Sequence, residues 1–365
     1  MKFTRVGASV AMAAIAALTL AACASNEPTA AEPGTAAAGE EQLTGTLAAS
    51  GASSQGTAQT SWIAGFQAVQ PGIQINYAGG GSGAGRTDFT NGTSAFIGSD
   101  RAFKMEEIEA GGFGNCVDGT DLVEIPAYIS PIAVAFNVEG VDTLNLDPAT
   151  LAKIFKGEIT NWNAPEIAAL NAGVTFPDLA ITPVHRSDTS GTTGNFTSYL
   201  VEAAPDVWTF EDSDDWPIEG GEGAQETPGV QQALTSGNGT IGYLDASAAG
   251  DLSTAAIQTG SEFVELSPEA AAAVVDNSTL EEGRAATDLS FELDRSAEGV
   301  YPIVLVSYLI GCAEYTDPAV GANVKAYFDY VISPEAQDAA AENAGSAPIS
   351  DDLRTQAQAA VDAIK

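Results

Sequence analysis

The chain has few basic residues. Its 365 residues include 13 lysines and arginines against 49 aspartates and glutamates, so the formal net charge at pH 7 is -36. Binding to nucleic acid irrespective of base sequence needs clustered cations that neutralise phosphates, and this composition argues against it. The same shortage argues against attachment to anionic lipid through a basic protein face.

Metal-binding side chains are scarce as well. The sequence has one histidine and three cysteines, and neither a cysteine cluster nor a set of spaced carboxylates that would complete a metal site. We therefore expect no metal and no other cofactor. Apolar residues are plentiful, because hydrophobic residues make up 45% of the chain. That content is enough for a sizeable core and excludes disorder for the bulk of the chain.

The first residues follow the pattern of a secretory signal peptide. Lys2 and Arg5 precede a short apolar run, and the small residues at positions 21 and 22 precede Cys23. This order resembles the lipobox of bacterial lipoproteins, in which that cysteine carries the lipid. We expect residues 1–22 to be removed and Cys23 to anchor the exported protein to the outer face of the cell membrane. An ordinary signal peptide with a coincidental cysteine is the alternative.

Residues 23–42 are expected to form a flexible tether. They consist of small and polar residues with no aromatic side chain, and such a composition cannot bury enough surface to offset the cost of ordering.

The other two cysteines form an even pair in a chain expected to be exported. Disulfides persist in that redox setting, so we predict a bond between Cys116 and Cys312. Such a bond ties an early segment to a late one and implies that both ends of the chain share a domain. Two free buried thiols are the alternative.

Strand-like and helix-like patterns alternate along the body of the chain. Helical periodicity is visible in residues 57–69, 192–203, 319–332 and 334–343, and β-branched or alternating runs in residues 73–77, 126–137, 181–184 and 300–310. This order predicts an α/β protein with largely parallel sheets. Residues 211–226 hold seven acids and no base, and we interpret them as a solvated loop rather than a calcium site.

Small-residue loops precede several of the predicted helices. They are ASGASS (residues 49–54), GGGSGAG (79–85, before a helix expected near Arg86) and HRSDTSGTT (185–193). A helix N-terminus presents unpaired N–H groups and a positive dipole end, and glycines let the backbone approach a ligand closely. Three such loops together predict one anion site to which all three contribute. A single loop of this kind would be explained by ordinary capping of its helix.

Asp100, in the segment FIGSD (residues 96–100), is unusual beside an anion site. A carboxylate repels an anion unless the anion brings a proton that the carboxylate accepts. Phosphate carries such a proton at pH 7 and sulfate does not, so an acceptor here would select phosphate by penalising the unprotonated rival.

The loops ASGASS, GGGSGAG, IGSD and HRSDTSGTT, in this order, resemble those of the periplasmic phosphate-binding proteins that supply the phosphate-specific ABC importer. Residues 154–163 and 239–243 are also similar to that family. The resemblance implies a two-lobed fold, in which each lobe is a mainly parallel sheet flanked by helices and the ligand lies in the cleft between them. It implies a first lobe made of residues 43–128 and 300–365, a second lobe of residues 129–299, and permease subunits of the importer as partners of a monomer.

The resemblance also implies a set of phosphate ligands. Asp100 would accept the phosphate proton and Arg186 would pair with both the phosphate and Asp100. Donors would come from the first two loops and from a helix start, namely Ser53, Ser54, Ser82, Ser190, Gly191 and Thr192.

Two residues beside this set of ligands depart from the pattern that the resemblance implies. Thr189 stands where many relatives have glycine, so a left-handed backbone there would be strained. Arg101 directly follows Asp100 and is expected to lower its pKa or to act as a second cation.

Two other functions fit parts of the sequence. An exported hydrolase of phosphate esters would use His185, Asp188 and Ser190, but these lie on one strand-to-helix turn, where a catalytic triad is hard to build. A dinucleotide site would use Gly79, Gly81 and Ala84, a weak pattern by itself. We therefore predict a binding protein without enzymatic activity.

Overall fold

A computed structural model describes residues 43–365. Within them, β1 (Gly45–Gly51), β2 (Ile73–Ala78) and β3 (Phe96–Ser99) form parallel pairs around β1. Next in the sheet come β13 (Val304–Cys312) and β4 (Leu122–Asn137), and β13 runs antiparallel to both β3 and β4. Two long antiparallel strands therefore border the parallel part of this sheet.

The sheet continues beyond β4 with β8 (Thr240–Asp245), β6 (Thr182–Arg186) and β7 (Glu222–Ala224). β8 is antiparallel to β4, whereas β6 is parallel to β8 and β7. The strand β9 (Ser253–Thr259) also pairs with β4. The remaining strands are short: β5 (Leu144–Leu146), β10 (Glu262–Val264), β11 (Thr279–Leu280) and β12 (Phe291–Glu292). The fold is α/β as predicted, but the pairs made by β4 and β13 are antiparallel, because these strands connect two parallel regions.

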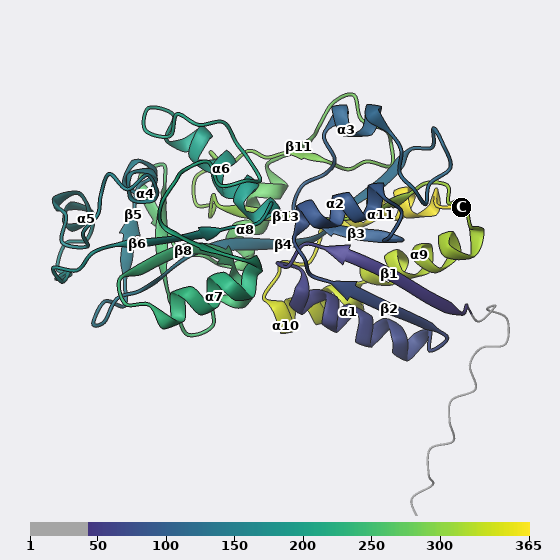
Figure 1. Cartoon of the computed structure of the whole chain (residues 1–365), viewed down its shortest axis with the longest axis horizontal. Coiled ribbons are helices and arrows are strands. Elements are labelled where there is room, and N and C mark those ends of the chain that lie inside the picture. The colour runs from purple at the N-terminus through teal and green to yellow at the C-terminus, as the bar shows by residue number, and fades with distance from the viewer. Residues whose placement is uncertain (1–42) are drawn as a thin grey trace, which may run out of the picture. The chain divides into compact units, whose positions relative to one another are not determined.

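Helices lie against both regions of the sheet (Figure 1). With β1–β3 lie α1 (Gly56–Val69), α2 (Ser82–Thr90), α3 (Met105–Ala110), α9 (Pro318–Val331), α10 (Pro334–Ala344) and α11 (Asp351–Asp362). Beyond β4 lie α4 (Pro148–Phe155), α5 (Pro165–Leu170), α6 (Gly191–Ala203), α7 (Glu226–Ser236) and α8 (Pro268–Asp276). Elements from the start and the end of this part of the chain therefore pack together, and α4–α8 form a second group.

Local sequence explains where many helices begin. Asp147, Ser267, Asp317 and Ser333 each precede a proline, and each side chain accepts an N–H of the first turn of its helix. A capping oxygen followed by proline at the first helical position satisfies free N–H groups and presets the backbone angle. The predicted helices are confirmed as α1, α6, α9 and α10, although α2 begins at Ser82 rather than near Arg86.

The strands β4 and β13 form the centre of the core. All but the last residue of β4 and all of β13 are buried, which explains the continuous apolar runs that predicted them. Among residues 43–365, no helix is long and apolar enough to cross a bilayer. The calls on residues 1–22, on the tether and on Cys23 lie outside the described residues.

The predicted disulfide between Cys116 and Cys312 is present. Cys312 ends β13, and Cys116 lies in the segment between α3 and β4. The bond therefore links an early segment to a late one, as its sequence separation of 196 residues requires.

We expect reduction of this disulfide to lower the free energy of unfolding by about 2–4 kcal/mol, because the cross-link restricts a long loop of the unfolded chain. Urea denaturation with and without reductant measures the change. The variant carrying both Cys116→Ala and Cys312→Ala should match the reduced parent and be insensitive to reductant. Equal unfolding midpoints for the oxidised parent and this variant would contradict the stabilising role.

Candidate functional site

The three small-residue loops meet at one place. The loop after β1 and the glycine loop after β2 touch where the N–H of Gly81 donates to the carbonyl oxygen of Gly51, at 2.8 Å. The loop after β6 joins them where the N–H of Gly83 donates to the carbonyl oxygen of Thr189, at 3.1 Å. Each loop follows the carboxyl end of a strand, the edge at which ligands bind in open α/β sheets.

Asp100, which follows β3, lies at the centre of these loops and is 3% exposed. Its Oδ1 accepts hydrogen bonds from the hydroxyls of Ser54 and Ser307, each at 2.7 Å, and its Oδ2 accepts one from Thr192 at 2.9 Å. Its backbone N–H donates to Oγ of Ser82 at 3.1 Å. Four of the predicted site residues, Asp100 included, are thus joined by direct hydrogen bonds.

The charge of Asp100 is set by opposing effects. Burial raises the pKa of this carboxyl above its usual value. Hydrogen bonds from Ser54, Ser307 and Thr192, together with the positive charge of Arg186, act in the opposite direction because they stabilise the ionised form. The carboxylate is therefore held as an acceptor by hydroxyl donors rather than by a contacting cation.

Arg186 does not pair with Asp100, which corrects the expectation. Its Nε donates to Oδ1 of Asp188 at 2.8 Å, and its Nη2 pairs with Oδ2 of the same carboxylate. The N–H of Glu226 also donates to Asp188, at 2.9 Å. The partner lies two residues along the same loop, where a carboxylate fits the two-pronged guanidinium. Burial tends to raise the pKa of Asp188, but Arg186 outweighs this and leaves that pKa below its usual value.

The glycine loop lies close against this ion pair. A Cβ on Gly81 would lie 2.7 Å from Oδ2 of Asp188 and 3.4 Å from Nη2 of Arg186, and Gly81 has a φ of 98°. Only glycine fits this conformation and this distance without strain. The buried guanidinium of Arg186, 3% exposed, is thereby held beside the start of α2.

The start of α6 approaches Asp100 from the other region of the sheet. A Cβ on Gly191 would lie 2.6 Å from Cβ of Asp100 and 2.9 Å from Oγ of Ser82. Gly191 and Thr192 are the first helical residues, whose N–H groups have no partner inside the helix. The N–H of Ser190 donates to the carbonyl oxygen of Asp214 at 2.8 Å, so Ser190 has its hydroxyl, not its N–H, to offer an anion.

Ser53 lies at the rim of this cluster. Its Oγ hydrogen-bonds to Oγ1 of Thr227 at 3.0 Å and accepts the N–H of Thr227 at 3.1 Å. Thr227 belongs to the first turn of α7, so the loop after β1 contacts a second helix start. All eight predicted ligand residues therefore lie in or beside one cluster of loops.

Arg101 and residues 211–226, the acidic segment, have contacts that differ from those expected from the sequence. Arg101 pairs with Asp214 at 2.8 Å and with Glu107 at 2.7 Å rather than with Asp100. Arg86 pairs with the same oxygen of Asp214 at 2.5 Å. Asp214 is only 12% exposed, so residues 211–226 do not form a solvated loop throughout. The partly buried carboxylate of Asp214 joins the loop before β7 to α2 and to the segment after β3.

The strain expected at Thr189 is absent. Among the non-glycine residues at 43–365, only Glu226 has a positive φ, of 60°. Thr189 therefore keeps an ordinary backbone, and its side chain lies against Gly83, where a Cβ would come within 2.5 Å of it.

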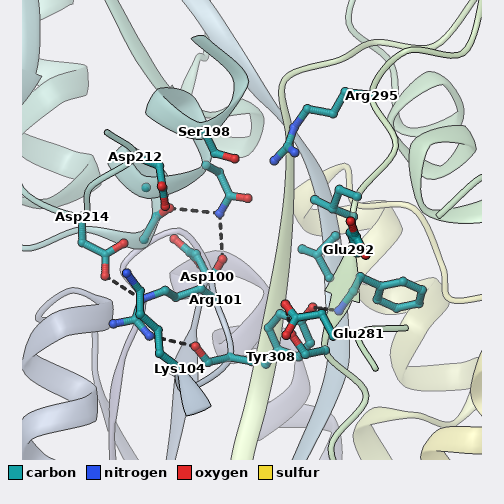
Figure 2. A pocket seen from close by; sticks show the side chains of 18 of the residues that line it. Asp100, Arg101, Lys104, Ser198, Asp212, Asp214, Glu281, Glu292, Arg295 and Tyr308 are labelled. Atoms are coloured by element: carbon teal, nitrogen blue, oxygen red, sulfur yellow. Dashed lines mark hydrogen bonds and ion pairs between the residues drawn. The ribbon is translucent and has the colours of Figure 1, made fainter. Parts of the chain in front are cut away.

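A cavity of about 520 Å³ adjoins the cluster. Figure 2 shows Asp100, Arg101 and Asp214 on one side of it and Arg295, Glu292 and Tyr308 on the other. Side chains of both signs line it, so the approach to Asp100 has no uniformly positive surface. No group of three metal-binding side chains occurs within the described part of the chain.

The residues of the hydrolase alternative are not arranged as a triad. The two ring nitrogens of His185 lie 2.9 Å from the carbonyl oxygen of Arg186 and 3.1 Å from that of Gly220, and the ring stacks on Trp216. Asp188 is held by Arg186, and Oγ of Ser190 accepts the N–H of Thr193. This geometry does not favour transfer of the serine proton to the histidine.

Comparison with known proteins identifies the family. The model of the PBP superfamily domain matches residues 36–335. Phosphate-binding protein PstS3 of Mycobacterium bovis is 35% identical over 376 residues, which cover 100% of both chains. The chain belongs to the PstS family of phosphate-binding proteins. A further member, phosphate-binding protein PstS 2 of Mycobacterium tuberculosis, is 32% identical over 372 residues, again covering 100% of both chains.

Solved structures similar to this PstS-family chain share its two-lobed fold. The high-affinity periplasmic phosphate-binding protein PfluDING, solved with phosphate, matches with a TM-score of 0.68 and 20% identity, covering 86% of this chain and 93% of that one. A phosphate ABC transporter substrate-binding protein from Clostridium perfringens matches with a TM-score of 0.58 and 20% identity, covering 82% and 98%.

Several residues of this PstS-family site were not predicted. Asp188, Asp214, Thr227 and Ser307 contact predicted residues through their side chains. Ser307 could have been noticed in the sequence, because it is a polar residue inside the apolar run of residues 300–310. Asp188 and Asp214 lie in polar loops and Thr227 lies in the first turn of α7, and nothing in the local pattern sets these three apart.

Proposed function

We propose that the protein binds inorganic phosphate outside the cytoplasmic membrane and delivers it to the permease subunits of a phosphate ABC importer. The observation that carries the proposal is the buried carboxylate of Asp100, surrounded by hydroxyl donors and two helix starts, with the guanidinium of Arg186 nearby. The names of the PstS relatives, which cover the whole chain, support it.

The proposed ligand shell combines donors with a single acceptor. The N–H groups of Ser54, Gly191 and Thr192, the hydroxyls of Ser53, Ser82 and Ser190 and the guanidinium of Arg186 would bind phosphate oxygens, and Oδ2 of Asp100 would accept the proton of the phosphate. Sulfate has no proton to donate there, so it would face a repelling carboxylate. The proposed ligand residues are Ser53, Ser54, Ser82, Asp100, Arg186, Ser190, Gly191 and Thr192.

The proposed lobes are residues 43–128 with 300–365, and residues 129–299. Pairing of β13 with β3 and β4 supports the first grouping, and pairing of β4 with β8 supports a connection through the long strands. Contacts such as that between Gly191 and Asp100 join the two groups. Phosphate between them would add contacts made only in the closed form and so increase its population.

Binding rather than catalysis is proposed, since within residues 43–365 no group beside Asp100 is placed to activate a nucleophile. A single chain supplies all eight ligand residues, which supports a monomer. Light scattering that gives the mass of a dimer for residues 43–365 would contradict the monomer.

Replacement of Arg186 tests the proposed function. We expect Arg186→Ala to weaken phosphate binding by roughly 3 to 5 kcal/mol, because the anion would face the buried carboxylate of Asp100 and the partly buried carboxylate of Asp188 without a cation. Isothermal titration calorimetry measures the change. The control is Arg354→Ala, which removes an arginine on α11 that pairs with Asp351. Unchanged phosphate affinity in Arg186→Ala would contradict the proposed site.

We also propose that lipid on Cys23 anchors the exported protein. We expect the full-length parent to be recovered with membranes and released by detergent, and Cys23→Ser to be recovered in the soluble fraction, because the serine cannot be lipid-modified. Cell fractionation followed by immunoblotting measures how the parent and the variant distribute between the membrane and soluble fractions. Recovery of the parent in the soluble fraction would contradict the anchor.

A further inference from the structure

Among the hydroxyls of residues 43–365 that contact Asp100, that of Ser307 comes from a long central strand, β13. Ser307 is fully buried, and the register of β13 against β4 shifts between Ser307 and Tyr308. The extra residue is Ala127 of β4, so the β-bulge lies in β4, opposite Ser307 and Tyr308, and increases the local twist of the two strands. Here the hydroxyl of Ser307 donates to Oδ1 of Asp100 at 2.7 Å.

A buried chain of hydrogen bonds leads to Ser307. The hydroxyl of Tyr327 donates to Oε1 of Gln59 at 2.7 Å, and Nε2 of Gln59 donates to Oε1 of Gln55 at 2.8 Å. Nε2 of Gln55 then donates to Oγ of Ser307 at 2.7 Å. These four side chains, which we call the relay, come from α1 and the residue before it, from α9 and from β13, and each is at most 1% exposed.

The relay has one direction. An amide nitrogen can only donate, so Oγ of Ser307 accepts from Gln55 and must use its own proton on Asp100. Burial raises the pKa of Tyr327 well above its usual value, and its hydroxyl therefore keeps the proton that begins the relay. Consecutive bonds of this kind polarise and strengthen one another in a low-dielectric interior.

The two oxygens of Asp100 are consequently not equivalent. Oδ1 receives the protons of both Ser54 and Ser307, whereas Oδ2 receives only that of Thr192. Thr192 is in the first turn of α6, the helix start whose free N–H groups lie beside Asp100. Oδ2 is the oxygen that remains for a proton brought by a ligand.

We propose that Ser307, oriented by the relay, is a specificity-determining residue: it keeps Oδ1 of Asp100 as a saturated acceptor, so that the site takes a protonated oxyanion in preference to an unprotonated one. The inference rests on the phosphate-binding function proposed above. Ser307 itself is a positioning residue, since it acts on the ligand through Asp100.

Other charged and titratable groups face the same carboxylate. Arg186 acts on it electrostatically from β6 and favours the ionised form. Burial raises the pKa of Tyr77, on β2, and the charge of Asp100 adds to this effect, while the hydroxyl of Tyr77 donates to the carbonyl oxygen of Ala52. Arg101, the next residue in the chain, is paired with Glu107 and Asp214. Substitution of Ser307 leaves all these groups in place.

The test compares the pH dependence of phosphate and sulfate binding in the parent and in Ser307→Ala by calorimetry. Loss of one donor destabilises the ionised Asp100, so the pH below which phosphate affinity falls should move up by about one unit. A neutral carboxyl can donate to sulfate, so the phosphate-to-sulfate affinity ratio near pH 5 should fall about tenfold. Gln55→Met interrupts the relay one step earlier and should shift both the pH dependence and the affinity ratio in the same direction. This variant replaces Ser307→Ala as the test if Ser307→Ala does not fold.

Two controls separate this role from a packing effect. Ser130→Ala removes another fully buried hydroxyl, on β4, which donates to the carbonyl oxygen of Pro131 rather than to Asp100, and should keep the parental profile. Ser307→Thr retains the hydroxyl and should restore that profile. If the parent binds phosphate selectively and a folded Ser307→Ala or Gln55→Met keeps its pH profile and ratio, the role of Ser307 is overturned. A parent that binds neither anion overturns the proposed function itself.

Discussion

A buried carboxylate needs compensation, and the site is arranged around the compensation of Asp100. Removal of this charge from water is costly unless hydrogen bonds or an opposite charge replace the hydration. Hydroxyls from the loop after β1, from β13 and from α6 supply those bonds, and Arg186 acts from a distance because Asp188 holds it. The result is an ionised acceptor surrounded by donors, which suits an anion that still carries a proton.

The fold brings these groups together from distant parts of the chain. The donors lie at the carboxyl ends of parallel strands and at helix starts, where backbone N–H groups are free. The long strands β4 and β13 connect the two regions of the sheet, and Ser307, on β13 opposite a bulge in β4, donates its hydroxyl proton to Asp100. Binding then depends on short-range dipoles and not on long-range attraction, because a chain with a formal charge of -36 repels anions at a distance.

Much of this architecture was predictable from local patterns. Helix periodicity, glycine loops after strands and an even cysteine pair in an exported chain indicated the α/β fold, the convergent loops and the disulfide. Pairings between side chains were not predictable. Asp188 is a nearer partner for Arg186 than Asp100 is, and Asp214 contacts Arg86 and Arg101 only after folding. Ser307 lies opposite a bulge in β4, and such a local change in strand pairing leaves no mark in the pattern of the facing strand.

The most direct test of the account is calorimetric titration of residues 43–365, stripped of bound ligand, with phosphate and then with sulfate between pH 5 and pH 9. The account predicts tight binding of phosphate and far weaker binding of sulfate across this range, because only phosphate brings a proton for Asp100. Comparable binding of the two anions would contradict the role of Asp100, and absence of heat with both would contradict phosphate as the ligand.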